Sequence, residues 1–125
     1  MVTKILVVED DPTTLDMVTI MLQLRDYEII VAKNGIEGID KASAENPDLI
    51  VTDIVMPELN GIEMIKQLRS KSGRAGVPIL VITGNDMENA KEAIRAGANR
   101  ALAKPFSPDL LHVFIKDLLK KAPAP

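Results

Sequence analysis

The chain has 125 residues, close to the commonest size of a single globular domain. Its net charge of −3 and aromatic content of 2% argue against a nucleic-acid-binding domain, which needs a basic surface or stacking side chains. No apolar run approaches the roughly 20 residues of a membrane span, and the first is too short for a signal peptide. The absence of cysteine excludes disulfides and suits a reducing compartment. We therefore expect a cytoplasmic domain with no membrane or nucleic-acid partner.

Short apolar segments alternate with helical patterns along the chain. Several of these segments are rich in Val and Ile and hardly alternate with polar residues, which is typical of strands buried on both faces of a parallel sheet. Strands are predicted at 4–8, 27–32, 48–52, 78–83 and 100–103. Strands that alternate with helices predict an α/β fold of the (βα)₅ type, a doubly wound parallel sheet with helices on both faces.

Side chains that can accept a hydrogen bond from a free helix N–H precede three of the five predicted helices. Asp11 and Ser107 are such caps, and Pro12 and Pro108 behind them fit the first helical position. Asn60 is the predicted cap of the third helix. These residues fix where the first, third and fifth helices begin.

The remaining helix boundaries follow from turn residues and from the apolar pattern. The second helix is predicted at about 35–45, with Ile36, Ile39 and Ala42 facing the core. The fourth is predicted at about 86–97 and the fifth at about 107–121. The whole of 1–121 is expected to form one domain, and the Ala/Pro pattern of 122–125 predicts an extended tail or the start of a linker.

Polar residues stand where four of the predicted strands end. Glu9 and Asp10 follow the first strand, Asp53 ends the third, Thr83 ends the fourth and Lys104 follows the fifth. In an open parallel sheet, the functional crevice lies beyond the carboxyl ends of the strands. We therefore expect these five side chains to converge at one edge of the sheet.

Three carboxylates in a small volume need a counterion. Oxygen ligands without His or Cys select a hard cation, and Mg²⁺ fits best because it tolerates a few carboxylates together with water and phosphate oxygens. Lys104 and Thr83 would add an ammonium group and a hydroxyl, which suit a phosphoryl group. Asp53 stands centrally among them and is predicted to be the nucleophile, forming an aspartyl phosphate.

Four motifs carry a resemblance that covers residues 3 to about 121. The segments ILVVEDD, VTDIVMPELNGIE, ILVITG and LAKPF resemble, in the same order, the receiver domain of two-component response regulators of the chemotaxis-regulator type. The resemblance implies a flavodoxin-like sheet with strand order 2-1-3-4-5. It also implies that the domain is a cytoplasmic signalling switch, and that it catalyses no reaction beyond its own phosphorylation and dephosphorylation.

The resemblance assigns a role to each residue at the strand ends. It implies that Glu9, Asp10, Asp53 and the backbone carbonyl of Val55 bind Mg²⁺. It implies that Asp53 is the phosphoacceptor. Thr83 matches the hydroxyl that moves toward the phosphoryl group.

Lys104 matches the lysine that pairs with the phosphoryl group, and the Lys104–Pro105 bond is often cis in such proteins. The implied donor is a phosphohistidine on a sensor histidine kinase or phosphotransfer protein. The implied output partner or domain docks on helix four, strand five and helix five.

The sequence departs from the family pattern at Ala101, where many receivers carry a Tyr or Phe that acts as a rotamer switch. A methyl group cannot swing between exposed and buried positions, so we expect activation to be read through the loop after Thr83 and through helix four. Val55, two residues after Asp53, is apolar and cannot orient a water molecule as an acid or amide there would, and Asn85, two residues after Thr83, is small and neutral. Slow self-dephosphorylation is therefore predicted.

Two other functions remain open from the residues. A Mg²⁺-dependent phosphatase would need a second acid two residues after the nucleophile, where this chain has Val55. A nucleotide-binding or purely structural module is the third interpretation. It would need a glycine-rich loop after the first strand, where the chain instead has EDDPTT.

Overall fold

The computed structural model describes residues 2–56, 58–70, 76–84 and 86–121, in which five strands alternate with five helices. The elements are β1 (Lys4–Val8), α1 (Pro12–Gln23), β2 (Glu28–Ala32), α2 (Gly35–Glu45), β3 (Leu49–Asp53), α3 (Gly61–Ser70), β4 (Ile79–Thr83), α4 (Met87–Ala96), β5 (Arg100–Ala103) and α5 (Pro108–Lys121). The predicted tail at 122–125 and Asn85 lie outside the described residues. No helix within the described ranges is both long and apolar enough to span a bilayer.

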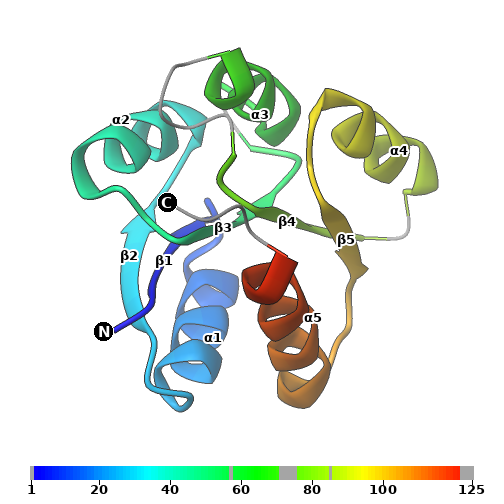
Figure 1. The fold of residues 1–125 in the computed structure, drawn as a ribbon. Coiled ribbons are helices and arrows are strands. Elements are labelled where there is room, and N and C mark those ends of the chain that lie inside the picture. The colour runs from blue at the N-terminus through cyan, green and yellow to red at the C-terminus, as the bar shows by residue number, and fades with distance from the viewer. Residues whose placement is uncertain (1, 57, 71–75, 85, 122–125) are drawn as a thin grey trace.

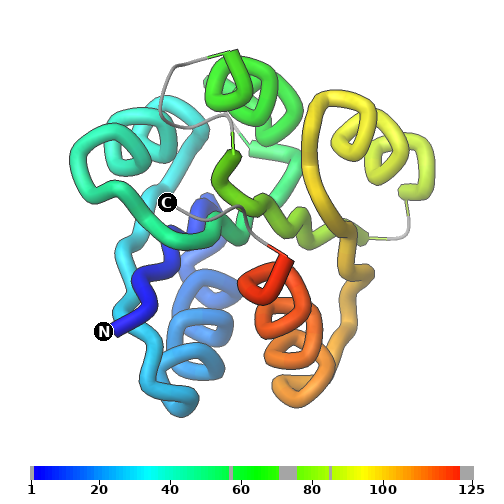
Figure 2. Tube along the Cα trace, in the orientation of Figure 1, coloured from blue at the N-terminus to red at the C-terminus, as the bar shows by residue number. Residues whose placement is uncertain are grey.

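The sheet is parallel throughout and has the order β2-β1-β3-β4-β5, which confirms the predicted topology. Figures 1 and 2 show α1 and α5 on one face of the sheet and α2, α3 and α4 on the other. Because side chains of a strand point alternately to the two faces, β1 contributes to both layers. Leu6 packs in the cluster under α2, α3 and α4, while Ile5 and Val7 pack in the cluster under α1 and α5.

The three central strands are buried almost completely, as their continuous apolar runs predict. In β4 every residue is buried, and in β1 and β3 four of the five residues are buried. Each fully buried Val, Leu or Ile contributes roughly 1.5–3 kcal/mol of transfer free energy relative to an exposed position. Because helices pack on both faces of the sheet, the sheet is a rigid support for the residues at its strand ends.

The helices begin where the sequence predicts. The side chains of Asp11, Asn60 and Ser107 each accept a hydrogen bond of 3.0 Å from the backbone N–H three residues further on. Asp86 provides a similar cap for α4, accepting from the N–H groups of Glu88 and Asn89. These bonds satisfy helix N–H groups that have no partner within the helix.

The prediction that Ile36 faces the core is wrong, although the bounds of α2 are as predicted. Ile36 is 49% exposed, whereas Ile39 and Ala42 are buried. The helix turns its glycines inward instead: a Cβ on Gly38 would lie 2.6 Å from the Met64 sulfur of α3. The close contact between α2 and α3 therefore occupies the inner face and leaves Ile36 outside.

Candidate functional site

The polar residues predicted from the strand ends do converge at the carboxyl edge of the sheet. Asp53 is the last residue of β3 and stands opposite Ile82 of β4. One residue beyond β1, the Glu9 N–H donates to the Ala32 carbonyl at 3.0 Å, and one residue beyond β5, the Lys104 N–H donates to the Thr83 carbonyl at 2.8 Å. Strand pairing thus extends to the residues that carry the polar side chains.

Glu9, Asp10 and Asp53 form an acidic cluster. One carboxylate oxygen from each of the three lies within 4.8 Å of the others. Glu9 is only 4% exposed, Asp53 is partly buried and Asp10 is exposed. Octahedral Mg²⁺ places its ligand oxygens roughly 3–4 Å apart, so small side-chain adjustments would suit this trio to the ion. The all-oxygen donor set therefore fits a hard divalent cation.

The Lys104 ammonium group lies between two of these acids. Its nitrogen is 3.6 Å from Asp53 Oδ2 and 3.8 Å from Glu9 Oε1. The lysine follows β5 and precedes a cis Lys104–Pro105 peptide bond, as the sequence resemblance implies. Lys104 therefore offsets part of the negative charge on the cluster, and its ammonium group faces Oδ2 of Asp53.

The pKa of the Glu9 carboxyl is raised from 4.5 to about 7, and its burial is the largest cause. The Asp11 N–H, which donates to Glu9 Oε2 at 3.2 Å, and the Lys104 charge lower this pKa, while the Asp53 charge raises it. Glu9 is therefore a buried carboxyl group whose negative charge is only partly stabilised by the Asp11 N–H and the Lys104 ammonium group.

The Asp53 carboxylate is oriented by its own backbone. The Ile54 N–H donates to Asp53 Oδ1 at 2.7 Å, which leaves Oδ2 toward Lys104. Thr52, whose side chain is fully buried, donates its hydroxyl to the Asp53 carbonyl oxygen at 2.8 Å. Thr52 was not among the predicted site residues; its signal in the sequence is a hydroxyl within an otherwise apolar strand.

Gly61 lets α3 approach the end of β3. Its N–H donates to the Ile54 carbonyl at 2.8 Å, and a Cβ on it would collide with the Asp53 carbonyl oxygen. Gly61 is the first residue of α3, and its φ is not positive. Close packing, and not a special backbone angle, requires glycine there.

Asp11 does not belong to the acidic cluster. Its carboxylate accepts from the Thr14 hydroxyl at 2.7 Å and from the Thr14 N–H at 3.0 Å, and these bonds lower its pKa. Asp11 is thus the cap of α1, as predicted.

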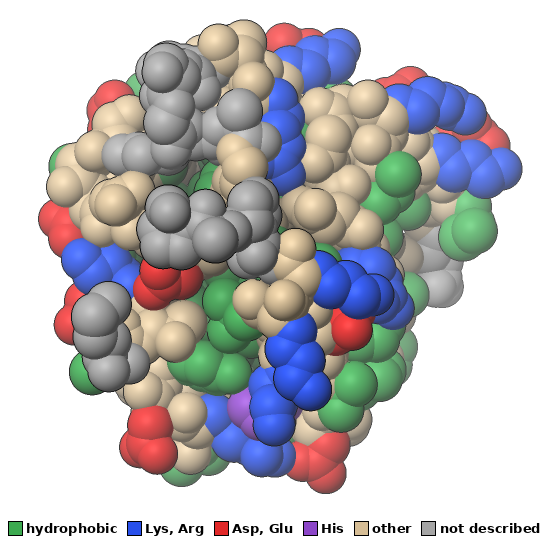
Figure 3. All heavy atoms as spheres, viewed as in Figure 1, with side chains coloured by type: hydrophobic (Ala, Val, Ile, Leu, Met, Phe, Trp, Pro, Cys, Tyr) green, Lys and Arg blue, Asp and Glu red, His purple; other side chains and the backbone are tan. Residues whose placement is uncertain are grey.

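His112 lies on α5, with its Nδ1 3.4 Å from the Tyr27 hydroxyl. Burial, followed by the charges of Arg25 and Lys116, lowers its pKa. In Figure 3 the purple histidine is surrounded by blue Lys and Arg side chains. His112 therefore packs against Tyr27.

The response regulator receiver domain family matches residues 5–116. The chain belongs to this family. Receiver domains act as phosphoaccepting switches in two-component signalling and bind Mg²⁺ at an acidic site. The acidic cluster and the strand order agree with a receiver domain.

Two curated relatives and one solved structure illustrate the likeness. The receiver domain is 38% identical over 120 residues to the alkaline phosphatase synthesis transcriptional regulatory protein PhoP of Bacillus subtilis, covering 95% of this chain and 49% of PhoP. It is 36% identical over 109 residues to Protein PilH of Pseudomonas aeruginosa, covering 86% of this chain and 90% of PilH. The chain thus spans about half of PhoP and nearly all of PilH.

The solved structure is the receiver domain of the sensor histidine kinase PA1611 of Pseudomonas aeruginosa. It superposes with a TM-score of 0.91 at 28% identity, covering 97% of this chain and all of that one. A magnesium ion is coordinated in the active site cleft of that protein. The likeness supports a metal at the corresponding edge of the receiver fold.

Gly61→Ala should lower the free energy of unfolding by about 1–3 kcal/mol, because the added Cβ forces α3 away from the Asp53 carbonyl. Urea unfolding at neutral pH measures this change. Gly84→Ala is the matched control, since a Cβ there has no neighbour within 4 Å. Equal stabilities of the two variants would contradict the close contact.

The stability of the metal-free protein should fall as pH rises. The folded pKa of Glu9 is raised above its unfolded value, so the folded state binds the proton more tightly. The resulting stability is fully present below about pH 4.5 and is lost as pH rises through about 7. Urea unfolding in a chelator across this range measures the slope.

Glu9→Gln should remove this contribution to the slope and be the more stable protein above pH 7, because burying a neutral amide costs less than burying an ionised carboxylate. Glu92→Gln, on the exposed side of α4, is the matched control and should keep the slope of the unmodified protein. A slope that survives Glu9→Gln would show that other groups cause it.

Proposed function

We propose that Asp53 is the phosphoacceptor of this receiver domain and that Thr83 and Lys104 bind the transferred phosphoryl group. The observation that carries the proposal is the position of Asp53 Oδ2. That oxygen lies 3.6 Å from the Lys104 ammonium group, while the backbone holds the other carboxylate oxygen. A partly exposed, oriented carboxylate facing a cation suits nucleophilic attack on a phosphoryl group.

We further propose that Glu9, Asp10, Asp53 and the backbone carbonyl of Val55 hold Mg²⁺. The three carboxylates already cluster, and Val55 begins the loop directly after Ile54, whose backbone is hydrogen bonded at both sides. A bound Mg²⁺ supplies positive charge to the oxygens of the phosphoryl group. Deprotonated Glu9 is needed for this binding, so metal affinity is expected to rise with pH.

The transfer itself is a displacement at phosphorus. Asp53 Oδ2 forms the new O–P bond as the N–P bond of a phosphohistidine on a histidine kinase or phosphotransfer protein breaks, and the electron pair of that bond returns to the imidazole. Lys104 neutralises charge on the phosphoryl oxygens, and the Thr83 hydroxyl donates a hydrogen bond to one of them. The domain catalyses this transfer and the later hydrolysis only on itself.

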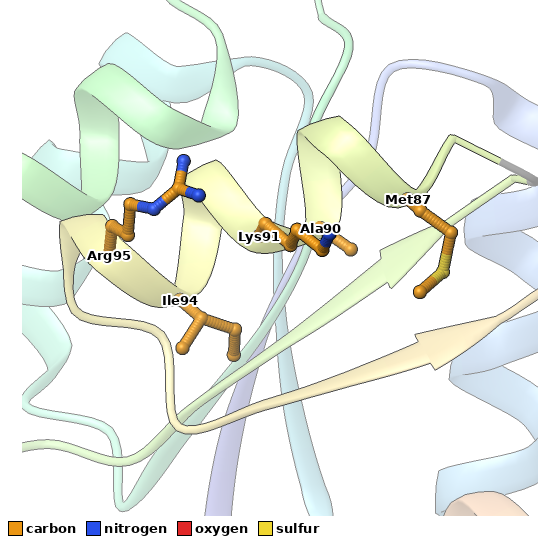
Figure 4. Close-up of a pocket in the computed structure, with 5 residues that line it drawn as sticks. All are labelled: Met87, Ala90, Lys91, Ile94 and Arg95. Carbon is orange, nitrogen blue, oxygen red and sulfur yellow. The ribbon is translucent and has the colours of Figure 1, made fainter.

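The output partner or domain is proposed to bind across α4, β5 and α5. Figure 4 shows a shallow pocket on α4 lined by Met87, Ala90, Lys91, Ile94 and Arg95. Met87 is 68% exposed and Ile94 is 44% exposed, so apolar surface is available there beside two cations. The phosphoryl group, by adding charge at the sheet edge, would shift the loop after Thr83 and with it α4.

We place this activity in the cytoplasm, where phosphohistidine donors of this kind and a cysteine-free domain are both expected. The receiver unit is proposed to span 1–121. Docking of nucleic acid or membrane on the domain itself is not proposed, since its net charge is −3.

Incubation with acetyl phosphate and Mg²⁺ should add one phosphoryl group, which intact mass spectrometry detects. Asp53→Asn should add none, because an amide is a poor nucleophile. Asp16→Asn, on the exposed side of α1, is the control and should be phosphorylated like the unmodified protein. Phosphorylation of Asp53→Asn would refute the assignment, and repeated turnover of a chromogenic phosphate ester would favour a phosphatase instead.

The phosphorylated protein should lose its phosphoryl group slowly, over minutes and not seconds. Val55 is 69% exposed beside the site but has no group that can orient an attacking water molecule. Val55→Asn should shorten the lifetime several-fold, and Val55→Leu should leave it unchanged. Decay of the phosphorylated mass after desalting measures the lifetime, and a half-life of a few seconds in the unmodified protein would contradict the prediction.

A further inference from the structure

The Thr52 hydroxyl has an unusual place for a polar group. The residue lies in the central strand β3, is 0% exposed, and is paired with Val8 of β1 and Val81 of β4. Its side chain is on the face covered by α2, α3 and α4, among apolar neighbours. Because burying a hydroxyl without a partner is costly, its bond to the Asp53 carbonyl at 2.8 Å is what makes threonine acceptable there.

That bond acts on the peptide that orients the acceptor. The Asp53–Ile54 peptide accepts from the Thr52 hydroxyl at its carbonyl end and donates to Asp53 Oδ1, at 2.7 Å, from its N–H end. The next carbonyl, that of Ile54, accepts from the Gly61 N–H at 2.8 Å. The backbone on the carboxyl side of Asp53 is therefore held at three successive groups.

We propose that Thr52 is a positioning residue for phosphoryl transfer. Its hydroxyl fixes the plane of the Asp53–Ile54 peptide, so that the Ile54 N–H holds Oδ1 of Asp53 and Oδ2 is the oxygen offered to phosphorus. The inference rests on the proposed function of Asp53. In this role Thr52, a buried residue that is not itself a proposed phosphoryl or metal ligand, orients the Asp53 nucleophile.

The geometry favours an orienting role over a purely structural one. Valine has nearly the shape of threonine and suits a central strand at least as well, so packing alone does not require the hydroxyl. A rotation of the peptide would turn the Ile54 N–H away from Oδ1 and release the carboxylate to other rotamers. It would also move the Val55 carbonyl, which follows directly and is a proposed metal ligand. Small misplacements of a reacting group reduce the rate strongly.

Two pairs of variants isolate the hydroxyl. Thr52→Val removes it at constant shape, and Thr52→Ser against Thr52→Ala makes the same comparison with smaller side chains. Thr19→Val is the matched control, because within the described residues the Thr19 hydroxyl of α1 is buried and has no hydrogen-bond partner. The initial rate of phosphoryl uptake from acetyl phosphate with Mg²⁺ is measured by intact mass. The ¹H–¹⁵N shift of the Ile54 amide and the urea midpoint are recorded alongside.

Thr52→Val and Thr52→Ala should take up the phosphoryl group about threefold to tenfold more slowly, as expected for loss of one hydrogen bond. Thr52→Ser and Thr19→Val should react within about twofold of the unmodified protein. The Ile54 amide proton should shift upfield in the variants without the hydroxyl and stay in place in Thr52→Ser, because its bond to Oδ1 weakens only when the peptide turns.

Other outcomes separate this inference from the proposed function. Uptake by Thr52→Val at the rate of the unmodified protein would overturn the inference and leave Asp53 as the acceptor. Equal slowing of Thr52→Ser and Thr52→Ala, or slowing that follows the urea midpoint, would show a structural role and also overturn it. Absence of uptake in the unmodified protein would refute the proposed function, and the positioning role with it. If Thr52→Val does not fold, the Ser and Ala pair still decides.

Discussion

Repulsion between carboxylates at the edge of a buried sheet is the constraint on which this structure depends. The β2-β1-β3-β4-β5 order places the ends of β1 and β3 side by side, so Glu9 and Asp53 cannot avoid each other. Two like charges about 4 Å apart repel by roughly 4 kcal/mol at an effective dielectric near 20. Lys104 offsets part of this cost, while burial, followed by the charge of Asp53, raises the pKa of Glu9. The all-oxygen cluster therefore suits a bound cation.

The residues around Asp53 hold its carboxylate in one orientation. The sheet is buried on both faces, so its strand ends have little freedom to separate. Gly61 allows the start of α3 to pack against the Asp53 carbonyl oxygen at the end of β3. The Thr52 hydroxyl donates a hydrogen bond to that same carbonyl oxygen. In the proposed transfer, a carboxylate held this way would attack without first having to find its orientation, which is how a rigid scaffold lowers the entropic part of a barrier.

Most of the fold and the main site residues could be predicted because they depend on local signals. Strand and helix bounds follow from apolar periodicity and caps, and the convergence of Glu9, Asp53 and Lys104 follows from parallel strand ends. Three features could not be predicted. The exposure of Ile36 and the tight contact at Gly61 depend on how closely helices approach, and the role of Thr52 depends on the direction of one hydroxyl. Neither the distance between packed helices nor the direction of a hydroxyl produces a periodic pattern in the sequence.

Ala101, at a position where many receivers carry an aromatic residue, restricts how a change at the site can be transmitted to the surface of the domain. Ala101 packs against the cluster under α2, α3 and α4, and its methyl group has no second rotamer to adopt. The edge strand is nevertheless tied to the site through its backbone, since Thr83 pairs with Ala103 and its carbonyl accepts from the Lys104 N–H. A backbone displacement at Thr83 would therefore be passed on to Lys104 and the end of β5. The Asp86 cap of α4 stands only three residues beyond Thr83, so α4 is the element that such a movement reaches first.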